Sequence, residues 1–435
     1  MNLHRLLQRR VEQSGPVRVG LIGAGKFGTM FLSQVSTTPG LEVAAIADLS
    51  PDRARAACRS TGWDAGRIDA VRFTDAAMAL MEDARIEVVI EATGHPAAGL
   101  RHAIGAIDAG KHIVMVNVEA DALAGPLLAE RAARAGVVYS LAYGDQPALV
   151  CEMVDWARTC GFAVIAAGKG TKYLPEFHAS TPATVWGYYG LTPEAAAAGG
   201  MNPQMFNSFL DGTKSAIEMA AIANATGLTP PPDGLGFPPC GARELASVLR
   251  PSNEGGALHH AGQVEVVSSV HRDGSPVADD LRWGVYVVFE APNDYAMRCF
   301  AEYGVVTDPS GRRAALYRPF HLIGLELNVS VLSAVLRREP TGAPDAWRGD
   351  VAAVAKRDLR EGEVLDGEGG ATVWGKLLPV SASLAAGALP IGLASRLPLT
   401  RAVAAGQVVT WRDVQLDERD EALRFRREME TRFAV

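Results

Sequence analysis

Three lysines and two carboxylates in the middle of the chain could bind an anion and move a proton. Lys169 and Lys172 follow an apolar strand in a glycine-punctuated stretch, and Asp211, Lys214 and Glu218 recur at helical spacing. Lysine is scarce, with seven in the chain, and ammonium groups neutralise phosphate or carboxylate. A desolvated lysine could also act as an acid or a base, because burial lowers its pKa. The alternative is that the lysines are solvated and that the row is a salt-bridged helix face.

Further polar side chains are candidates for contacts with a substrate. Asn207 could bind a hydroxyl, or it could serve in a turn or a helix cap. His321 precedes a predicted helix, and His178 lies in the same stretch as the first two lysines. We predict substrate contacts for Asn207 and His321. The sequence identifies no metal ligands, and it contains no HExxH or GxSxG motif that would favour a hydrolase.

Residues 17–48 have the spacing of a dinucleotide-binding turn. An apolar strand ends in Gly23, Gly25 and Gly28, and a helix follows. A second strand closes at Asp48, about twenty residues after the last glycine, as the fingerprint requires. The first glycine allows a tight turn, the second a close approach to the pyrophosphate, and the third close helix packing. The helix N-terminus supplies free N–H groups for the phosphates.

The choice between NAD and NADP is not decided by these residues. Asp48 could accept hydrogen bonds from the ribose and would repel the extra phosphate of NADP, whereas Arg53 could offset that repulsion. Thr93 and Gly94 follow another apolar strand and are expected beside the nicotinamide, unless Thr93 only caps the next helix. The predicted cofactor contacts are Gly23, Gly25, Lys26, Phe27, Gly28, Asp48, Arg53, Thr93 and Gly94.

The elements that must position these residues fall into three segments. From residue 17 to about 140, short strands alternate with helices, which is the pattern of a doubly wound parallel sheet. A helix over 211–225 and strands near 264–270 and 284–290 indicate a mixed second sheet. A Pro- and Gly-rich break at 339–349 precedes further short strands. We therefore predict an α/β protein with a Rossmann domain over 1–145, an α+β catalytic domain over 146–340 and a small β-rich domain over 350–435.

Composition argues against several classes of partner. The net charge of the 435 residues is −7 and no basic block is present, so neither nucleic acid nor a membrane surface is expected. Five scattered cysteines without a CxxC pair indicate reduced thiols in a cytoplasm. The N-terminus lacks the apolar core of a signal peptide, and no apolar run approaches the length of a membrane span. We expect a cytoplasmic homo-oligomer that acts on a small molecule.

The chain resembles two related groups of enzymes. Residues 17–48, GKHIV at 110–114 and the order of the domains are similar to the homoserine dehydrogenase superfamily, although NVEA at 117–120 lacks the lysine usual there. The chain looks more like the 1-deoxy-D-xylulose 5-phosphate reductoisomerase-like oxidoreductases with a C-terminal SAF-type domain. The segments that carry this resemblance are YGDQP (143–147), GKGTKY (168–173), NSFLDGTK (207–214), HLIGLE (321–326) and KRDLREGEVL (356–365).

The resemblance implies an NAD(P)H-dependent oxidoreductase for a small phosphorylated sugar or polyol. It favours NADP(H), with NAD(H) as the alternative, and a divalent metal is not indicated by the residues. The best-known reaction of the family converts 1-deoxy-D-xylulose 5-phosphate to 2-C-methyl-D-erythritol 4-phosphate in isoprenoid biosynthesis. Lys169, Lys172 and Lys214 would bind the phosphate and polarise a carbonyl or hydroxyl, and Glu218 or Asp211 would assist proton transfer. Two alternatives stay open: a homoserine dehydrogenase-like enzyme for an unphosphorylated amino or hydroxy acid, and a non-catalytic cofactor-binding sensor.

Overall fold

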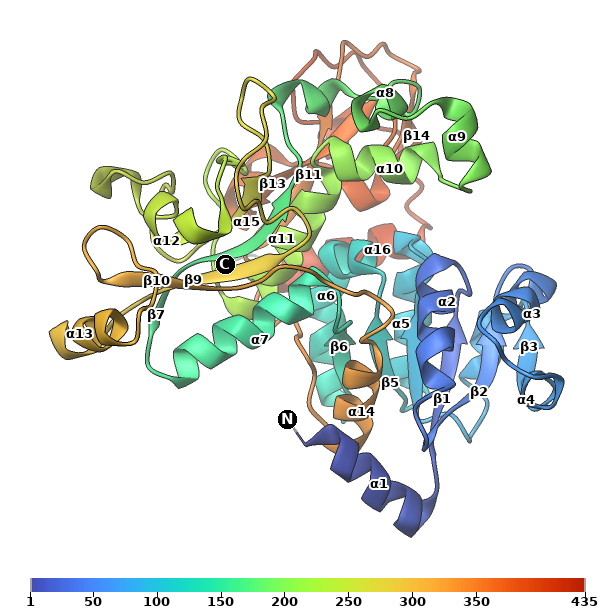
Figure 1. Cartoon of the computed structure of the whole chain (residues 1–435). Helices are drawn as coiled ribbons and strands as arrows, with labels where there is room; N and C mark the ends of the chain where they lie inside the picture. Colours follow the sequence, from blue (N-terminus) through green and yellow to red (C-terminus); the bar gives the residue numbers. More distant parts are fainter. Residues whose placement is uncertain (1, 434–435) are drawn as a thin grey trace. The chain divides into compact units, whose positions relative to one another are not determined.

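A computed structural model describes residues 2–433, which divide into two units (Figure 1). Unit 1 contains the chain up to Glu152 together with His321–Asp345. Unit 2 contains Met153–Phe320 together with the chain from Ala346 onward. The chain therefore passes from one unit to the other three times.

Unit 1 is built on a six-stranded sheet in which every pair of neighbours is parallel, in the order β3-β2-β1-β4-β5-β6. The order reverses between β1 and β4, and ligands of such sheets bind beyond the carboxyl ends of the strands at this point. The strands are β1 (Val17–Ile22), β2 (Leu41–Ala47), β3 (Arg72–Thr74), β4 (Val88–Glu91), β5 (His112–Met115) and β6 (Tyr139–Leu141).

Helices of unit 1 bury the apolar strands. One core cluster joins residues of β1, β2, β4 and β5 to the helices α1 (Leu3–Ser14), α2 (Lys26–Val35), α3 (Pro51–Ser60) and α14 (Asn328–Leu336) and to Ile68 of the short helix after α3. Helices α5 (Pro96–Asp108) and α6 (Val118–Arg134) pack against each other, and a short helix α4 (Ala65–Asp69) follows α3. The expected doubly wound parallel sheet is thereby confirmed.

Unit 2 contains a four-stranded mixed sheet in the order β10-β9-β7-β8 (Figure 1). β7 is parallel to β8 and antiparallel to β9, which in turn is antiparallel to β10. The strands are β7 (Ala163–Thr171), β8 (Gln263–Ser268), β9 (Val285–Glu290) and β10 (Arg313–Arg318). The helices before the C-terminal segment are α7 (Gln146–Thr159), which spans the division between the units, α8 (Val185–Tyr189), α9 (Pro193–Ala198), α10 (Pro203–Leu210), α11 (Thr213–Thr226), α12 (Leu245–Val248) and α13 (Asp294–Glu302).

The C-terminal segment forms small antiparallel sheets, as expected for a β-rich region. β11 (Gly349–Ala355) pairs with β13 (Val373–Pro379), and β12 (Val364–Asp366) pairs with β14 (Ser395–Pro398). Two helices complete it, α15 (Val380–Ala386) and α16 (Glu421–Phe433).

Helix α11 joins the two sheet systems of unit 2. It packs on β7 and β8 and also on β11 and β13. Twelve of its fourteen residues are buried as a result, and a helix enclosed in this way needs no polar face. Two predicted site residues, Lys214 and Glu218, lie on this helix. Both sheets therefore fix the position of their backbone.

The units divide the chain differently from the predicted domains over 146–340 and 350–435. Helix α14 falls in unit 1 because its apolar residues join the core of the parallel sheet. The C-terminal strands fall in unit 2 because β11 and β13 pack on α11.

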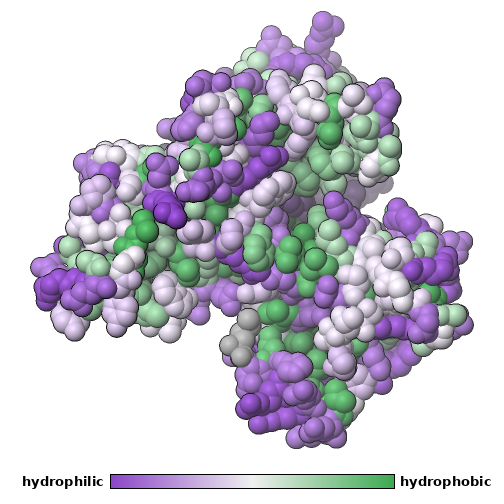
Figure 2. All heavy atoms as spheres, viewed as in Figure 1, coloured by the Kyte–Doolittle hydropathy of each residue, from purple (hydrophilic) through white to green (hydrophobic). Residues whose placement is uncertain are grey.

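The described surface mixes residue types. On the face drawn in Figure 2, hydrophilic and hydrophobic residues are interspersed. Among the helices of residues 2–433, none combines the length and the hydrophobicity needed to cross a membrane.

Candidate active site

The glycine turn after β1 has the backbone of a dinucleotide-binding loop. Gly23 has φ of +93°, and a Cβ added to it would lie 2.8 Å from the carbonyl oxygen of Ala92. A Cβ on Gly28 would lie 2.2 Å from the carbonyl oxygen of Gly23, whereas a Cβ on Gly25 would meet nothing within 4 Å. Gly25 leaves its backbone open to a ligand, whereas Gly23 and Gly28 have no room for a side chain. This arrangement fits a pyrophosphate bound at the start of α2.

Asp48 fixes this turn from the end of β2. Its Oδ2 accepts a hydrogen bond of 2.9 Å from the N–H of Ala24, and its Oδ1 accepts one of 2.9 Å from Ser50. Arg53 also donates to both oxygens. Burial raises the pKa of Asp48, but these bonds outweigh it and hold the pKa below its ordinary value. The Asp48 side chain is 2% exposed and that of Arg53 is 64% exposed, so the guanidinium is the group presented to solvent.

The loop after β4 is held by its own polar residues. Thr93 donates to the buried carboxylate of Glu91 at 2.6 Å, and Asn117 donates to Thr93 at 3.3 Å. Gly94 has φ of +69° with open space at its Cβ position. The cap of α5 is His95 rather than Thr93, since His95 accepts from the N–H of Ala98. Thr93 therefore has no capping role, and its place beside the nicotinamide stays a prediction.

In unit 2, Lys169 and Glu218 form a buried ion pair between β7 and α11. Their side chains are 8% and 3% exposed. The sequence places Lys169 after an apolar strand, but β7 continues to Thr171 and Lys169 lies within it. The lysine is thus held by a central strand and a largely buried helix, which is the rigid support that a proton-transferring group needs.

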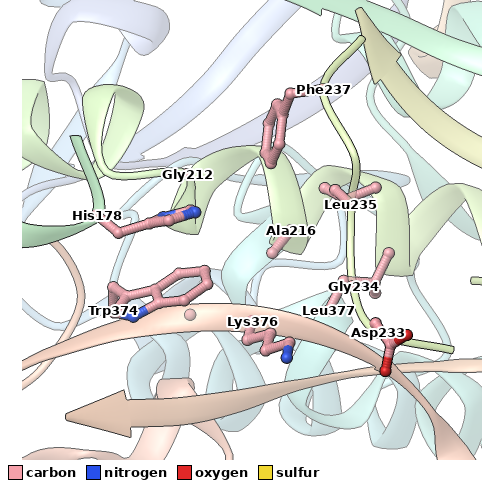
Figure 3. Close-up of a pocket in the computed structure, with 11 residues that line it drawn as sticks. His178, Gly212, Ala216, Asp233, Gly234, Leu235, Phe237, Trp374, Lys376 and Leu377 are labelled. Carbon is pink, nitrogen blue, oxygen red and sulfur yellow. The ribbon is translucent and has the colours of Figure 1, made fainter. Parts of the chain in front are cut away.

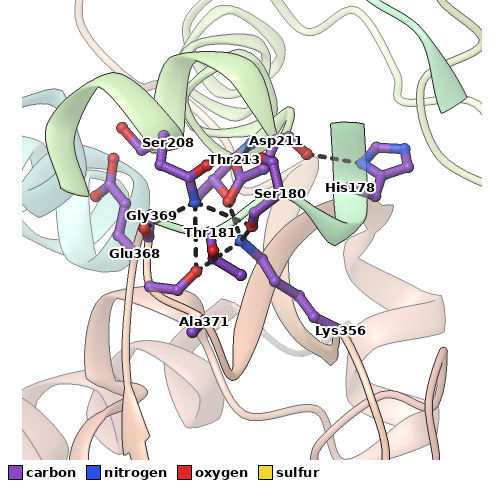
Figure 4. Close-up of polar contacts among 12 residues, drawn as sticks. His178, Ser180, Thr181, Ser208, Asp211, Thr213, Lys356, Glu368, Gly369 and Ala371 are labelled. Atoms are coloured by element: carbon purple, nitrogen blue, oxygen red, sulfur yellow. Dashed lines mark hydrogen bonds and ion pairs between the residues drawn. The ribbon is translucent and has the colours of Figure 1, made fainter. Parts of the chain in front are cut away.

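A second buried ion pair joins Asp211 to Lys356 (Figure 4). The Lys356 Nζ lies 2.7 Å from Oδ2 of Asp211 and donates also to the carbonyl oxygens of Ser180 and Gly370. Oδ1 of Asp211 accepts from the N–H of Thr213. Burial raises the pKa of Asp211, and the ammonium of Lys356 opposes that rise. All three ammonium protons of Lys356 are therefore donated in hydrogen bonds within the protein, and the pair joins the C-terminal segment to the turn before α11.

The expected row of Asp211, Lys214 and Glu218 on one helix face is wrong. Asp211 caps the C-terminus of α10, and Gly212 follows with φ of +91°. Helix α11 begins only at Thr213, so the predicted helix over 211–225 starts two residues too early. Because the chain turns between the two helices, the two carboxylates reach different lysines.

The other predicted substrate residues lie in different settings. Asn207 is fully buried, and its amide bridges Ser180 to the backbone of Gly369 and Gly370. Lys172 is half-buried, donates to the carbonyl oxygen of Tyr188, and has a pKa lowered by burial.

Two more of these residues complete the set. Lys214 is half-buried in the first turn of α11. His321 is half-buried and belongs to unit 1, whereas the lysines belong to unit 2.

His178 is neutral and has a defined tautomer. Its Nδ1 lies 2.7 Å from the carbonyl oxygen of Asp211, which can only accept, so Nδ1 carries the proton. Its Nε2 then accepts from the hydroxyl of Tyr173 at 2.9 Å. Burial lowers the pKa of His178 to about 4, although the bond to Asp211 opposes this.

Two lysines near this histidine were missed by the sequence reasoning. Lys356 and Lys376 both lower the pKa of His178 by their charge, yet they lie far along the chain in the C-terminal segment. Lysine is rare in this chain, and five of its seven lysines belong to unit 2. This uneven distribution is the sequence signal that could have pointed to Lys356 and Lys376. Among residues 2–433, no group of three or more His, Cys, Asp or Glu side chains could hold a metal ion.

Two protein-family models match the chain. Residues 17–116 match "Oxidoreductase family, NAD-binding Rossmann fold", and residues 144–327 match "Oxidoreductase DRL, catalytic domain". A comparison with curated proteins finds no match.

Solved structures resemble the chain in part. Myo-inositol dehydrogenase from Lactobacillus casei is 17% identical with a TM-score of 0.29, over 39% of this chain and 50% of that one. A homoserine dehydrogenase from Thiobacillus denitrificans is 19% identical with a TM-score of 0.38, over 48% of this chain and 49% of that one. Biliverdin reductase from Synechocystis sp. PCC 6803 is 21% identical with a TM-score of 0.28, over 42% of this chain and 55% of that one. The chain matches about half the length of each.

The family matches assign a class to each of the two functional regions described above. The glycine turn and Asp48 lie within the NAD-binding match, and the Lys169–Glu218 and Asp211 regions lie within the catalytic-domain match. The chain therefore combines a match to an NAD-binding oxidoreductase family with a match to an oxidoreductase catalytic domain.

Proposed function

We propose that the chain transfers a hydride between NADP(H) and a small phosphorylated sugar or polyol. The specific reaction proposed is the conversion of 1-deoxy-D-xylulose 5-phosphate to 2-C-methyl-D-erythritol 4-phosphate, as the sequence resemblance implies. The observation that carries the proposal is the buried Lys169–Glu218 pair. It places an ammonium and a carboxylate together on rigid elements inside the segment that matches an oxidoreductase catalytic domain.

This pair would supply the proton that the reduction of a carbonyl group needs. A bound reduced nicotinamide would supply the hydride for a substrate carbonyl carbon. For 1-deoxy-D-xylulose 5-phosphate, the linear carbon skeleton would first have to become branched, with one C–C bond broken and another formed, and the carbonyl left by that rearrangement would be the one reduced. Lys169 would donate a proton to the carbonyl oxygen as negative charge develops there, which yields a hydroxyl. Glu218 would hold the lysine in place through the ion pair, and solvent would restore the proton after the transfer.

The remaining predicted residues would bind the two phosphorylated groups. Lys172, directly after the end of β7, and Lys214, in the first turn of α11, are half-buried and would attract the substrate phosphate. Arg53 neutralises Asp48 and is 64% exposed, so it could meet the extra phosphate that distinguishes NADP. This arrangement supports NADP(H) over NAD(H).

The test follows NADPH absorbance with 1-deoxy-D-xylulose 5-phosphate as the substrate. We expect turnover by the wild type and a loss of about 100-fold or more in Lys169→Gln, with NADPH binding unchanged. Arg360→Gln, at an exposed position of unit 2, is the matched control. Turnover only on an unphosphorylated amino or hydroxy acid would overturn the substrate class.

A second variant guards against misfolding. Lys169→Gln leaves the Glu218 charge buried alone, so the double change Lys169→Gln with Glu218→Gln keeps the site neutral. Activity near the wild-type level in the folded double variant would remove the pair from the proposed mechanism.

The homo-oligomer expected for this chain is likewise a proposal, which light scattering of the purified protein tests.

A further inference from the structure

A cavity of about 250 Å³ lies inside unit 2 beside the start of α11 (Figure 3). Ala216 of α11 forms its floor, and the loop carrying Leu235 and Phe237 forms one wall. Trp374 and Lys376 of β13 form the other wall, next to His178. Sites for drug-sized ligands measure about 300–1,000 Å³, so this cavity suits a single-ring molecule and not a dinucleotide.

The aromatic walls of the cavity are uncharged. The rings of His178 and Trp374 are stacked with centroids 3.8 Å apart. Phe237 is stacked on Tyr173 at 3.9 Å and faces the edge of His178 at 6.3 Å. Both nitrogens of His178 are hydrogen-bonded and its pKa is lowered to about 4, so the imidazole presents a neutral ring.

The loop wall is held in a strained shape. Phe237 has φ of +48°, a conformation that side-chain-bearing residues seldom adopt. The carboxylate of Glu265 accepts from the N–H groups of Gly236 and Phe237, and Arg272 donates to the carbonyl oxygens of the same two residues. Strain of this kind persists where the surroundings over-determine it, which is common at ligand sites. The wall is therefore preformed.

Lys376, one of the residues that line the cavity, has no partner for its charge among the residues that the structure describes. Within residues 2–433, the ammonium of Lys376 forms no hydrogen bond or ion pair. Lys376 is half-buried, and Gly234 lies across from it, where a Cβ would come within 3.0 Å of the lysine Cε. Asp233 also lines the rim, but it is exposed and forms no ion pair with Lys376. The cavity is thus lined by aromatic and aliphatic side chains together with polar groups, and Lys376 is one of these polar groups.

We propose that this cavity binds a small organic anion with a flat or compact apolar body. Its carboxylate or phosphate would meet Lys376, and its body would lie against Trp374, Phe237 and Ala216. The proposal does not rest on the proposed reaction. Residues 374–377 lie outside both matched family segments, so the site assigns a role to the C-terminal segment: it supplies half of a ligand pocket whose floor is the helix that carries Glu218.

The probes are 4-fluorobenzoate and 4-fluorophenyl phosphate, followed by fluorine NMR on the full chain. The neutral 4-fluorobenzyl alcohol controls for the charge, and inorganic phosphate controls for the ring. We expect at least one fluorinated anion to bind the wild type, about tenfold or more tighter than the alcohol, since hydrogen bonds to charged groups contribute that much. Inorganic phosphate should displace it only weakly.

Variants locate the binding. Lys376→Gln should weaken the anion about tenfold, Lys376→Arg should retain it, and Ala216→Leu should abolish it by filling the floor. Arg360→Gln, exposed on the same C-terminal segment, should bind as the wild type does. Equal binding by Lys376→Gln, equal binding of the alcohol, or no binding of either anion at millimolar concentration would overturn the proposal. The NMR measurement does not depend on NADPH turnover. The proposed ligand cavity can therefore be confirmed or contradicted independently of the proposed reaction.

Discussion

The ammonium of Lys356 lies 2.7 Å from Oδ2 of Asp211, although 145 residues separate the two in the sequence. Both side chains are almost completely buried, at 2% and 0% exposure. The pair fastens the residue after β11 to the turn between α10 and α11. The C-terminal segment is thereby bound to the segment that matches the catalytic domain, within one unit.

Breaking this pair should destabilise unit 2. Lys356→Met would leave the carboxylate of Asp211 buried and unpaired, which costs about 3–5 kcal/mol. The double change Lys356→Met with Asp211→Asn should recover a large part of that loss. Urea unfolding followed by circular dichroism measures both. A single variant within about 1 kcal/mol of the wild type would show that the pair contributes little.

Lowering the pH should destabilise the protein through His178. Its folded pKa of about 4 lies below the ordinary 6.5, so the unfolded chain takes up a proton first. Stability due to the neutral imidazole is present above about pH 6.5 and is lost as the pH falls toward 4, up to about 3 kcal/mol. His178→Asn should remove that part of the pH dependence. Parallel unfolding curves for the two proteins across this range would contradict the assignment.

Arg53 should discriminate between the two nicotinamide nucleotides. Arg53→Gln should weaken NADPH about tenfold, because a charge-assisted contact to the extra phosphate would be lost, and should leave NADH binding nearly unchanged or improved. Nucleotide fluorescence in titrations of both proteins measures this. The melting temperature is the control, since the Arg53 side chain is 64% exposed. An equal loss for both nucleotides would argue against a phosphate contact.

Two glycines of the same turn should respond differently to alanine. In Gly28→Ala the new Cβ would lie 2.2 Å from the carbonyl oxygen of Gly23, so the backbone must shift and about 2–3 kcal/mol of stability should be lost. In Gly25→Ala the Cβ meets nothing within 4 Å, so stability should hold while nucleotide binding falls. Thermal unfolding with and without NADPH separates the two effects. Equal stabilities of the two variants would show that the turn is not as tight as described.

Most strands of the parallel sheet of unit 1 were predictable from local patterns. Apolar runs end near Gly23, Asp48 and Thr93, and helical patterns follow them, so these strands and their parallel type come from neighbouring residues. The short edge strand β3 and the order of the strands in the sheet were not predicted. The break between α10 and α11 has a local signal too, since Asp211-Gly212 is a turn dipeptide, although the regular charge spacing across it favours one continuous helix.

The rest of the site depends on contacts between distant residues. Helical spacing predicts neighbours three or four residues apart, and it carries no information about Lys356, which reaches Asp211 from another sheet. Nor does local pattern reveal that Trp374 stacks on His178 or that α14 joins the sheet of unit 1. Such pairings follow from how whole elements pack.

The return of His321–Asp345 to unit 1 limits how this enzyme can exchange parts with others. A gene fragment that ends at Glu152 would encode every strand of the parallel sheet but not Leu327, Val331 and Leu332, which complete its core. A recombination event that swaps the cofactor-binding half must therefore carry two separate stretches of coding sequence. A fragment made of one continuous stretch of this chain would lack part of that core.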